Sequence, residues 1–442
     1  MTTGLPATLR GEAHRPDEAA AGATVTLDDA GLTIALGDGA PIVAGYRDVA
    51  AVAVDGGTVT LDLGDASGTG RWIFERFGPM TGRLARGLRD GRLRQRLADG
   101  LVQLDPDAEI YLVEYEAPGE AGIAQLVYHD RGVVLAPLDE RLPWRRVRRR
   151  DIGAVAVEAA VGGVAVGGVG RSLPPVAGGP SLRLLRLGAI ATVHHDRWAA
   201  LRDGAAADAA AIVGGIVPDA PYALRSAAAR LLLDGRPIAA EAFGAGWPAL
   251  EAATLAVPPF DESYRVLRAV GGGDAAPRWL ACAPEQAGAP QAPRVWFFVG
   301  LPGNLVALEL VSEGAHATYV FRVVPRSAWT GTLPPGALED AVQDVSEALV
   351  DARFLREPIA LPAAQLAAPA ALRYRLALAA LPALAAARAR FVARLVHRDA
   401  ASWEAALRDL VTWQGSATDD DAEWPGRAAQ EAQVDAAAGS GG

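Results

Sequence analysis

Lysine is absent from this chain, and cysteine occurs only once. All 42 basic residues are therefore arginines, and their spread through the whole chain indicates GC-rich codon usage. Without lysine, none of the glycine-rich segments can complete a Walker phosphate loop. With Cys282 alone, the chain can form neither an intramolecular disulfide nor a zinc site with two thiolates. A lone thiol is typical of a reducing compartment, and we interpret Cys282 as a buried structural residue.

Long hydrophobic runs are missing as well. The longest apolar stretch, near Leu376–Ala387, is interrupted by Pro382. It is far shorter than the roughly 20 residues that cross a bilayer. The segment before residue 22 has no apolar core and carries acidic and basic side chains, unlike a secretory signal. We therefore expect a cytoplasmic protein with no transmembrane segment.

The balance of charge limits the class of partner. The formal net charge is −10, which argues against bulk binding to nucleic acid or to an anionic membrane, but not against one local basic patch. The length of 442 residues suits several domains with their own cores. The sequence contains no Gly-x-Ser-x-Gly elbow for a catalytic serine.

One short segment occurs twice. Residues 47–54 (RDVAAVAV) and 150–157 (RDIGAVAV) differ at only two positions. An Asp-x-Gly turn precedes each copy, and an acidic residue and a further short strand follow it. The same elements recur in one order at nearly one spacing, which indicates an internal duplication of a small β-unit. Residues 24–97 should superpose on 123–213, with Arg47 on Arg150 and Asp48 on Asp151.

Both copies show short alternating strands separated by Asp/Gly turns, and a helical pattern closes each copy. The expected strands of the first copy are 24–27, 32–36, 42–44, 49–54, 58–63 and 71–74, followed by a helix over 79–97. The expected strands of the second copy are 109–115, 124–128, 133–136, 152–157, 161–166, 182–187 and 189–194, followed by a helix over 197–212.

Six or seven short antiparallel strands closed by one C-terminal helix resemble the pleckstrin-homology-like (PH-like) barrel, and two such units in tandem resemble bacterial PH-like proteins. The resemblance covers roughly residues 22–215 and depends on the order of elements and on the repeated Asp-x-Gly and Arg-Asp segments. In the PH family, basic residues between the first two strands bind phosphoinositide headgroups. We assign that loop to 28–31 and 130–132. Neither segment carries a basic cluster, so headgroup binding is not expected.

The pattern changes after Pro218. Strands expected at 278–281, 294–299, 305–311 and 317–324 precede a helix over 334–354, and residues 363–413 are expected to be helical. We predict an α+β fold: two tandem antiparallel β-barrel or sandwich units that each end in a helix, a third meander-plus-helix unit, and a helical C-terminal region. The expected boundaries are a disordered N-terminus at 1–21, PH-like units at 22–104 and 105–216, the third unit at 217–360, C-terminal helices at 361–414, and a disordered acidic tail at 415–442.

The densest run of charge follows an aromatic residue. The candidate ligand-binding residues are Trp144, Arg145, Arg146, Arg148, Arg149 and Arg150. Arginine forks match phosphate oxygens in pairs, so this run could bind a phosphate-bearing ligand. In an extended strand Arg146, Arg148 and Arg150 would share one face. The alternative, which we expect, is that these arginines pair with carboxylates such as Asp139, Glu140 and Asp151.

Two further polar groups have simpler interpretations. Arginines recur three residues apart on the first helix and would share one broad polar side, as a wet face or as a dock for an acidic partner. They are Arg83, Arg86, Arg89 and Arg92. His194 and His195 would point to opposite faces of the predicted strand, so they could not easily share one ion. We expect no metal site and no cofactor.

The preferred hypothesis is a non-enzymatic scaffold or protein-interaction protein. A duplicated β-unit multiplies binding surface, and no residue cluster clearly meets the needs of catalysis. The first alternative is a peripheral sensor of a phosphate-bearing ligand or anionic lipid through residues 144–150. The second alternative is an enzyme whose site lies in the third unit. Its main polar groups would be Glu309, Glu313, His316 and Tyr319.

Overall fold

The structure is a computed structural model of the chain. It describes residues 7–37, 39–64, 70–105, 108–139, 141–177, 179–256, 260–311, 317–397, 399–416 and 422–427. Internal contacts divide the chain into two compact units. The first comprises Met1–Arg148 and Gly153–Arg197, and the second comprises Arg149–Ile152 and Trp198–Gly442. The fold class is α+β, which confirms the prediction.

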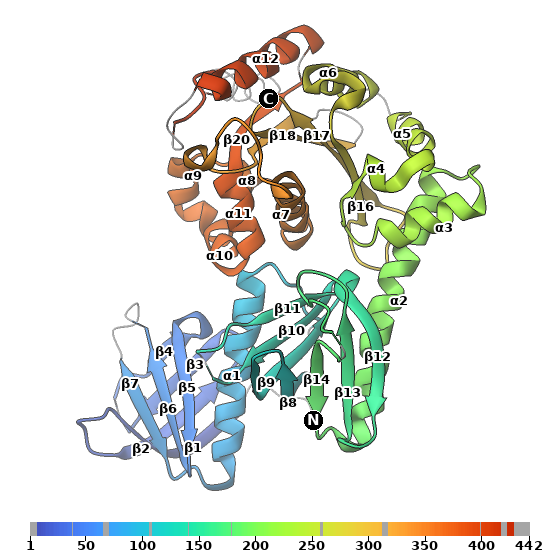
Figure 1. Cartoon of the computed structure of the whole chain (residues 1–442). Coiled ribbons are helices and arrows are strands. Elements are labelled where there is room, and N and C mark those ends of the chain that lie inside the picture. Colours follow the sequence, from blue (N-terminus) through green and yellow to red (C-terminus); the bar gives the residue numbers. More distant parts are fainter. Residues whose placement is uncertain are drawn as a thin grey trace. The chain divides into compact units, whose positions relative to one another are not determined.

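The first unit contains two seven-stranded sheets with the same strand order, in which the first and last strands are neighbours (Figure 1). The first sheet runs β4-β3-β2-β1-β7-β6-β5 and the second runs β11-β10-β9-β8-β14-β13-β12. The strands of the first sheet are β1 (Ala7–His14), β2 (Ala21–Leu27), β3 (Gly31–Leu36), β4 (Ile42–Gly45), β5 (Val49–Asp55), β6 (Thr58–Leu63) and β7 (Arg71–Glu75). Those of the second are β8 (Ile110–Ala117), β9 (Glu120–His129), β10 (Gly132–Pro137), β11 (Arg145–Arg148), β12 (Ile152–Glu158), β13 (Gly163–Gly168) and β14 (Leu182–Leu185).

The two sheets share one strand order, as the predicted duplication requires. A short 3-10 helix joins the fourth and fifth strands of each sheet: η1 (Tyr46–Asp48) in the first and η4 (Arg149–Asp151) in the second. Arg47 and Arg150 therefore occupy equivalent positions, and so do Asp48 and Asp151. The residue before each pair differs, because Tyr46 in the first copy corresponds to Arg149 in the second.

The two Asp-x-Gly turns share one steric requirement. A Cβ atom on Gly31 would lie 2.1 Å from the carbonyl oxygen of Ala44. A Cβ atom on Gly132 would lie 2.0 Å from the carbonyl oxygen of Val147. Each glycine is the first residue of the third strand of its sheet, and the fourth strand pairs with the third strand at this position. Glycine is needed at both positions because the neighbouring backbone fills the space of a side chain.

The prediction of a disordered segment at 1–21 is wrong for the described residues, because 7–14 form β1 between β2 and β7. Buried and exposed positions alternate along this strand, but Leu9 is its only large apolar residue, and the other buried side chains are alanines. The loop between the first two strands is therefore 15–20, and its counterpart in the second sheet is 118–119, instead of 28–31 and 130–132. Neither loop contains a cluster of arginines.

Helix α1 (Thr81–Asp99) packs against both sheets. Leu84 and Leu88 belong to the core of the first sheet, whereas Leu93 and Leu97 pack against Val127 and neighbouring residues of the second. The helix approaches the first sheet closely, as its glycines indicate. A Cβ atom would lie 2.6 Å from a Leu27 methyl if placed on Gly87, and 2.2 Å from the Tyr46 ring if placed on Gly91.

The second unit is built on a six-stranded antiparallel meander, in the order β15 to β20. Helices cover both faces, with α5, α6 and α12 on one side and α7 and α11 on the other (Figure 1). This arrangement explains why β17 and β19 are buried almost without interruption. The strands are β15 (Ile238–Ala239), β16 (Arg278–Pro284), β17 (Pro293–Leu301), β18 (Leu305–Val311), β19 (Ala317–Arg322) and β20 (Phe391–Val396).

The remaining helices lie between and after these strands. They are α2 (Ala191–Ile216), α3 (Tyr222–Leu231), α4 (Ala240–Phe243), α5 (Trp247–Leu255), α6 (Phe260–Gly271), α7 (Ala337–Asp351), α8 (Glu357–Ala360), α9 (Ala363–Ala367), α10 (Leu372–Ala380), α11 (Pro382–Arg390) and α12 (Ala400–Ser416). Trp403, Leu407 and Leu410 of α12 are buried in the core of the second unit, as their helical spacing predicts.

Three local predictions are wrong. Residues 189–194 do not form a strand, because α2 begins at Ala191. The region 363–413 is not wholly helical, since β20 completes the sheet by pairing with β19. The segment after residue 414 is not entirely without structure: the Trp424 side chain is buried, and its indole Nε1 donates to Asp409 Oδ2 at 2.9 Å. The acidic run 419–421 lies outside the described residues.

Within the part of the chain that the structure describes, none of the helices has both the length and the apolar composition of a membrane span. The bent pair Pro369–Ala380 and Pro382–Arg390 meets these two criteria only when its helices are taken together.

We predict that Gly132→Ala will destabilise the first unit by about 1–3 kcal/mol, because the new methyl group meets the Val147 carbonyl. Gly31→Ala should have an effect of the same order. Urea unfolding followed by circular dichroism measures the loss. Gly22→Ala is the matched control, since nothing lies within 4 Å of its Cβ position. Equal stability of Gly132→Ala and Gly22→Ala would contradict this account.

Candidate functional site

The basic run does not form one continuous strand. Strand β11 covers only 145–148, and the 3-10 turn η4 begins at Arg149. The expected alternation of side chains therefore ends at Arg148, and Arg146, Arg148 and Arg150 do not share a strand face. The six candidate residues separate into two groups: 144–148 belong to the first unit and Arg149 and Arg150 to the second.

In the first group, Arg145 pairs with Glu120, and the Arg146 guanidinium donates to the carbonyl of Gly100 at 3.0 Å. The backbone N–H of Arg148 donates to Ser172 Oγ at 2.9 Å. Asp139, one of the carboxylates expected to pair with the run, instead binds Arg141. Glu140 lies outside the described residues.

In the second group, Arg149 and Arg150 are buried among carboxylates of the second unit. Arg149 lies 2.7 Å from Asp208 and 2.8 Å from Asp234. Arg150 lies 3.0 Å from Glu347. The expected pairing with carboxylates is thus present at Arg149 and Arg150. Arg150 lies 3.8 Å from Asp151, one of the expected partners, whereas its closer contact and both partners of Arg149 come from distant elements. These arginines contribute to the fold and do not present an open phosphate site.

Burial and neighbouring charges shift the pKa values of two arginines in this network, Arg149 and Arg236. Burial alone would lower the pKa of the Arg149 guanidinium, but Asp234 and Asp208 outweigh burial and raise it above its ordinary value. Burial and the nearby Arg150 lower the pKa of Arg236, while Asp151 partly opposes them. The pairing keeps Arg149 charged inside the protein, and removing one partner would leave an uncompensated buried charge.

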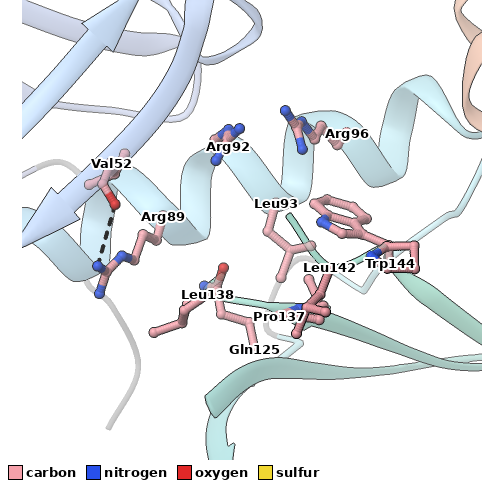
Figure 2. Close-up of a pocket in the computed structure, with 12 residues that line it drawn as sticks. Val52, Arg89, Arg92, Leu93, Arg96, Gln125, Pro137, Leu138, Leu142 and Trp144 are labelled. Atoms are coloured by element: carbon pink, nitrogen blue, oxygen red, sulfur yellow. Dashed lines mark hydrogen bonds between the residues drawn. The ribbon is translucent and has the colours of Figure 1, made fainter. Parts of the chain in front are cut away.

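Trp144 lies at a cavity of about 210 Å³ within the first unit, which we call the α1 groove. Arg89, Arg92 and Arg96 line one side of it from successive turns of α1. Figure 2 shows these arginines opposite an apolar wall from the second sheet and its β10–β11 connection. The wall consists of Pro137, Leu138, Leu142, Pro143 and Trp144. The guanidinium of Arg96 lies 5.2 Å from the centre of the Trp144 ring.

Two of the groove arginines also contact the first sheet. Arg89 donates to the carbonyl of Val52 at 3.4 Å, as Figure 2 shows, and Arg92 donates to the carbonyl of Ala50. Both carbonyls belong to β5. These bonds hold the two guanidinium groups at the groove instead of leaving them extended in water. The row of arginines is therefore only partly a solvent-exposed helix face. Arg83 and Arg86 are exposed, but Arg89 and Arg92 are partly buried.

A buried acid modulates the charge of the groove. Asp90 accepts a hydrogen bond of 2.7 Å from the Gln125 amide, and Gln125 lines the groove. Burial raises the pKa of Asp90 to about 6, against the opposing effect of Arg86 and other nearby arginines. Asp90 is thus ionised at neutral pH and loses its charge in mild acid. The positive potential of the groove should rise as pH falls through this range.

The histidine pair does not form a metal site. His194 is buried, and its Nδ1 lies 2.8 Å from the Tyr128 hydroxyl. Burial lowers its pKa to about 4, so it is neutral near pH 7. His195 instead contacts the neighbouring Asp196. Across the described ranges, no group of three or more His, Cys, Asp or Glu side chains could hold a metal ion. Cys282 is buried, and burial raises the pKa of its thiol to about 12, which makes it a poor nucleophile.

The polar cluster expected in the third unit is only partly described, because Glu313 and His316 lie outside the described residues. Tyr319 points away from Glu309, since the adjacent Thr318 is the residue that faces it across β18 and β19. Thr318 Oγ1 donates to Glu309 at 2.7 Å and lies 2.7 Å from His397 Nε2. His397 Nδ1 lies 3.0 Å from Ser263 Oγ. Sequence reasoning missed Thr318, His397 and Ser263, which come from distant elements.

Glu309 is fully buried in this chain of polar groups. Burial raises the pKa of its carboxyl to about 8, although the Thr318 hydrogen bond opposes the rise. The carboxyl oxygen Oε1 is buried and makes no hydrogen bond, and His397 Nε2 lies 3.7 Å from Oε2. The arrangement resembles an acid–base relay, but Ser263 is only 5% exposed.

The sequence contained part of the signal for the α1 groove. Trp144 and the arginine row on the first helix are both visible in the sequence, but nothing in the sequence indicates that they lie side by side. Their juxtaposition depends on α1 packing against the second sheet, and the apolar spacing of Leu93 and Leu97 is compatible with many partners for that face.

Comparison of the chain with protein-family models and with curated proteins gives no match.

We predict that Arg149→Met will destabilise the second unit by about 3–5 kcal/mol, because Asp208 and Asp234 would remain buried without their cation. Urea or thermal unfolding measures the change. Arg141→Met is the control, because its side chain is 89% exposed and pairs with the nearby Asp139, so its effect should be much smaller than that of Arg149→Met. Similar small effects from both substitutions would show that the buried pairs contribute little.

The raised pKa of Glu309 predicts a pH-dependent stability. The unfolded chain releases this proton near the ordinary pKa of 4.5, and the folded chain releases it near 8. The folded state therefore binds more protons between these values, so the contribution of Glu309 to stability falls as pH rises through the window. Glu309→Gln removes this titration. The stability of the variant relative to the wild type should increase from pH 5 to pH 8 in urea titrations. A constant difference would contradict the shift.

Proposed function

We propose that this protein is a non-enzymatic protein-interaction protein that binds an acidic segment of a partner protein in the α1 groove. The observation that carries the proposal is the groove itself, where Arg89, Arg92 and Arg96 face the apolar wall that contains Trp144. A binding site of this kind needs no reacting group. It needs only a fixed row of cations and a surface on which apolar side chains can pack.

The composition of the groove favours a peptide over a bare phosphate. Arginine forks would bind carboxylates as well as phosphates. The opposite wall, however, presents proline, leucine and tryptophan side chains, which a free phosphate would leave unused. An acidic segment with interspersed apolar residues would use both sides. Tryptophan and arginine are also the residue types that contribute most to protein–protein affinity.

The charge of the protein supports the same choice. A net charge of −10 repels anionic membranes and polyphosphates at long range. The loops between the first two strands of each sheet contain no basic cluster that could compensate. A partner protein can bring apolar contacts to the groove to offset this repulsion. The phosphate-sensor alternative therefore becomes one outcome of the binding experiment.

The test uses fluorescence anisotropy with labelled peptides in which glutamate alternates with leucine or phenylalanine. We expect saturable binding that weakens as salt rises, because exposed charges are screened. Arg96→Gln combined with Trp144→Ala should weaken binding at least tenfold. Arg83→Gln is the matched control, since Arg83 lies on the same helix but does not line the groove.

Asp90→Asn provides an opposite change at the same site. It removes the negative charge of Asp90 beside the arginines while keeping a side chain that can bond to Gln125. We expect tighter peptide binding near neutral pH, and a smaller gain at pH values well below 6, where Asp90 is already neutral.

Unchanged peptide affinity in the double variant Arg96→Gln, Trp144→Ala would refute the proposal. Saturable binding of tripolyphosphate without peptide binding would replace it with the phosphate-sensor reading.

A further inference from the structure

The two seven-stranded sheets of the first unit end in four edge strands: β4, β5, β11 and β12. An edge strand exposes backbone N–H and C=O groups that can pair with another strand. Proteins usually protect such edges with charged side chains, bulges, short length or covering groups. The four edges here differ in how far they are protected.

Three of the four edge strands have features that oppose pairing with a further strand. Strand β4 has only four residues, and β11 has four residues of which three are arginines. Strand β5 has a register shift between Val49 and Ala51. In addition, the carbonyls of Ala50 and Val52 on β5 accept hydrogen bonds from Arg92 and Arg89 of α1. A strand arriving at β5 would have to displace these arginines.

Strand β12 is the exception. It is seven residues long, and from Gly153 to Val157 it contains no charged residue and no proline. Ala154, Ala156 and Val157 are exposed, and the Val157 side chain remains 46% exposed. Val169, which is 54% exposed, lies against Gly153 and extends the apolar surface beside this strand.

We propose that β12 is a dimerisation edge, on which β12 of a second copy of this chain pairs antiparallel about a two-fold axis. The two second sheets would then form one continuous sheet across the axis. Pairing around Val155 sets Ala154 opposite Ala156 in both directions, and these small side chains allow close approach. An isologous contact of this kind uses both edges and closes without further growth.

The charge pattern selects a second copy as the occupant. An acidic or basic partner strand would gain nothing from the uncharged segment Gly153–Val157. In the two-fold pairing about Val155, Gly153 stands opposite Val157, and the two copies of Glu158 lie at opposite ends of the paired segment, so they do not face each other. The strand is therefore complementary to itself in size and in charge.

Sedimentation velocity of the full chain over a range of concentrations tests the proposal. We expect a reversible monomer–dimer equilibrium. Ala156→Arg should weaken it at least tenfold, because arginine on an edge opposes strand pairing. The matched control is Ala53→Arg, at the equivalent exposed position of β5, which should leave the equilibrium unchanged. Circular dichroism and the melting temperature show whether each variant keeps its fold.

A charge pair distinguishes edge pairing from a general effect of the substitution. Ala156→Arg and Ala156→Glu should each be monomeric alone, and a mixture should form the heterodimer, because residue 156 of one strand lies diagonally from residue 156 of the other. A wild type that stays monomeric at its highest soluble concentration would overturn the proposal. So would a dimer that persists in Ala156→Arg, or one that Ala53→Arg disrupts equally.

Discussion

The first unit depends on the burial of α1 between two sheets. Leu84 and Leu88 fill the first core, and one and a half turns later Leu93 and Leu97 cover the second sheet. Glycines on the helix allow the Leu27 and Tyr46 side chains to approach it. This double burial leaves one flank of the helix for its arginines. The α1 groove and the covered edge of β5 are both consequences of where that flank points.

The order and type of the secondary-structure elements could be predicted where turn motifs and alternating apolar residues determine them locally. The Asp-x-Gly turns at Gly31 and Gly132 and the alternating strands after them revealed two units of the same topology. Strand β1 was missed because, apart from Leu9, its buried side chains are small, so its alternating pattern gives only a weak apolar signal. Strand β20 was missed because its strand conformation depends on pairing with β19, a contact that local sequence does not display.

The candidate site was less predictable, because the side chains that meet there come from distant segments. Trp144 lies at the α1 groove, but the arginines that accompany it there lie on α1 and not in the adjacent run. Arg149 and Arg150 were expected beside Asp139, Glu140 and Asp151. Of these, Asp151 lies beside Arg150, but the closest carboxylates are Asp208, Asp234 and Glu347 of the second unit. The duplicated turn explains why: Tyr46 packs on its own helix, and a charged residue at the same position requires carboxylates elsewhere.

The placement of Arg149–Ile152 makes the second unit discontinuous in sequence. A fragment that starts at Trp198 would contain Asp208, Asp234 and Glu347 but not the arginines that neutralise them. Division of the chain after the second seven-stranded sheet and its closing helical turn would therefore remove part of the interior of the remaining piece. During synthesis, the four residues emerge before the rest of the unit, so its interior can be completed only after the helix that carries Glu347 has followed.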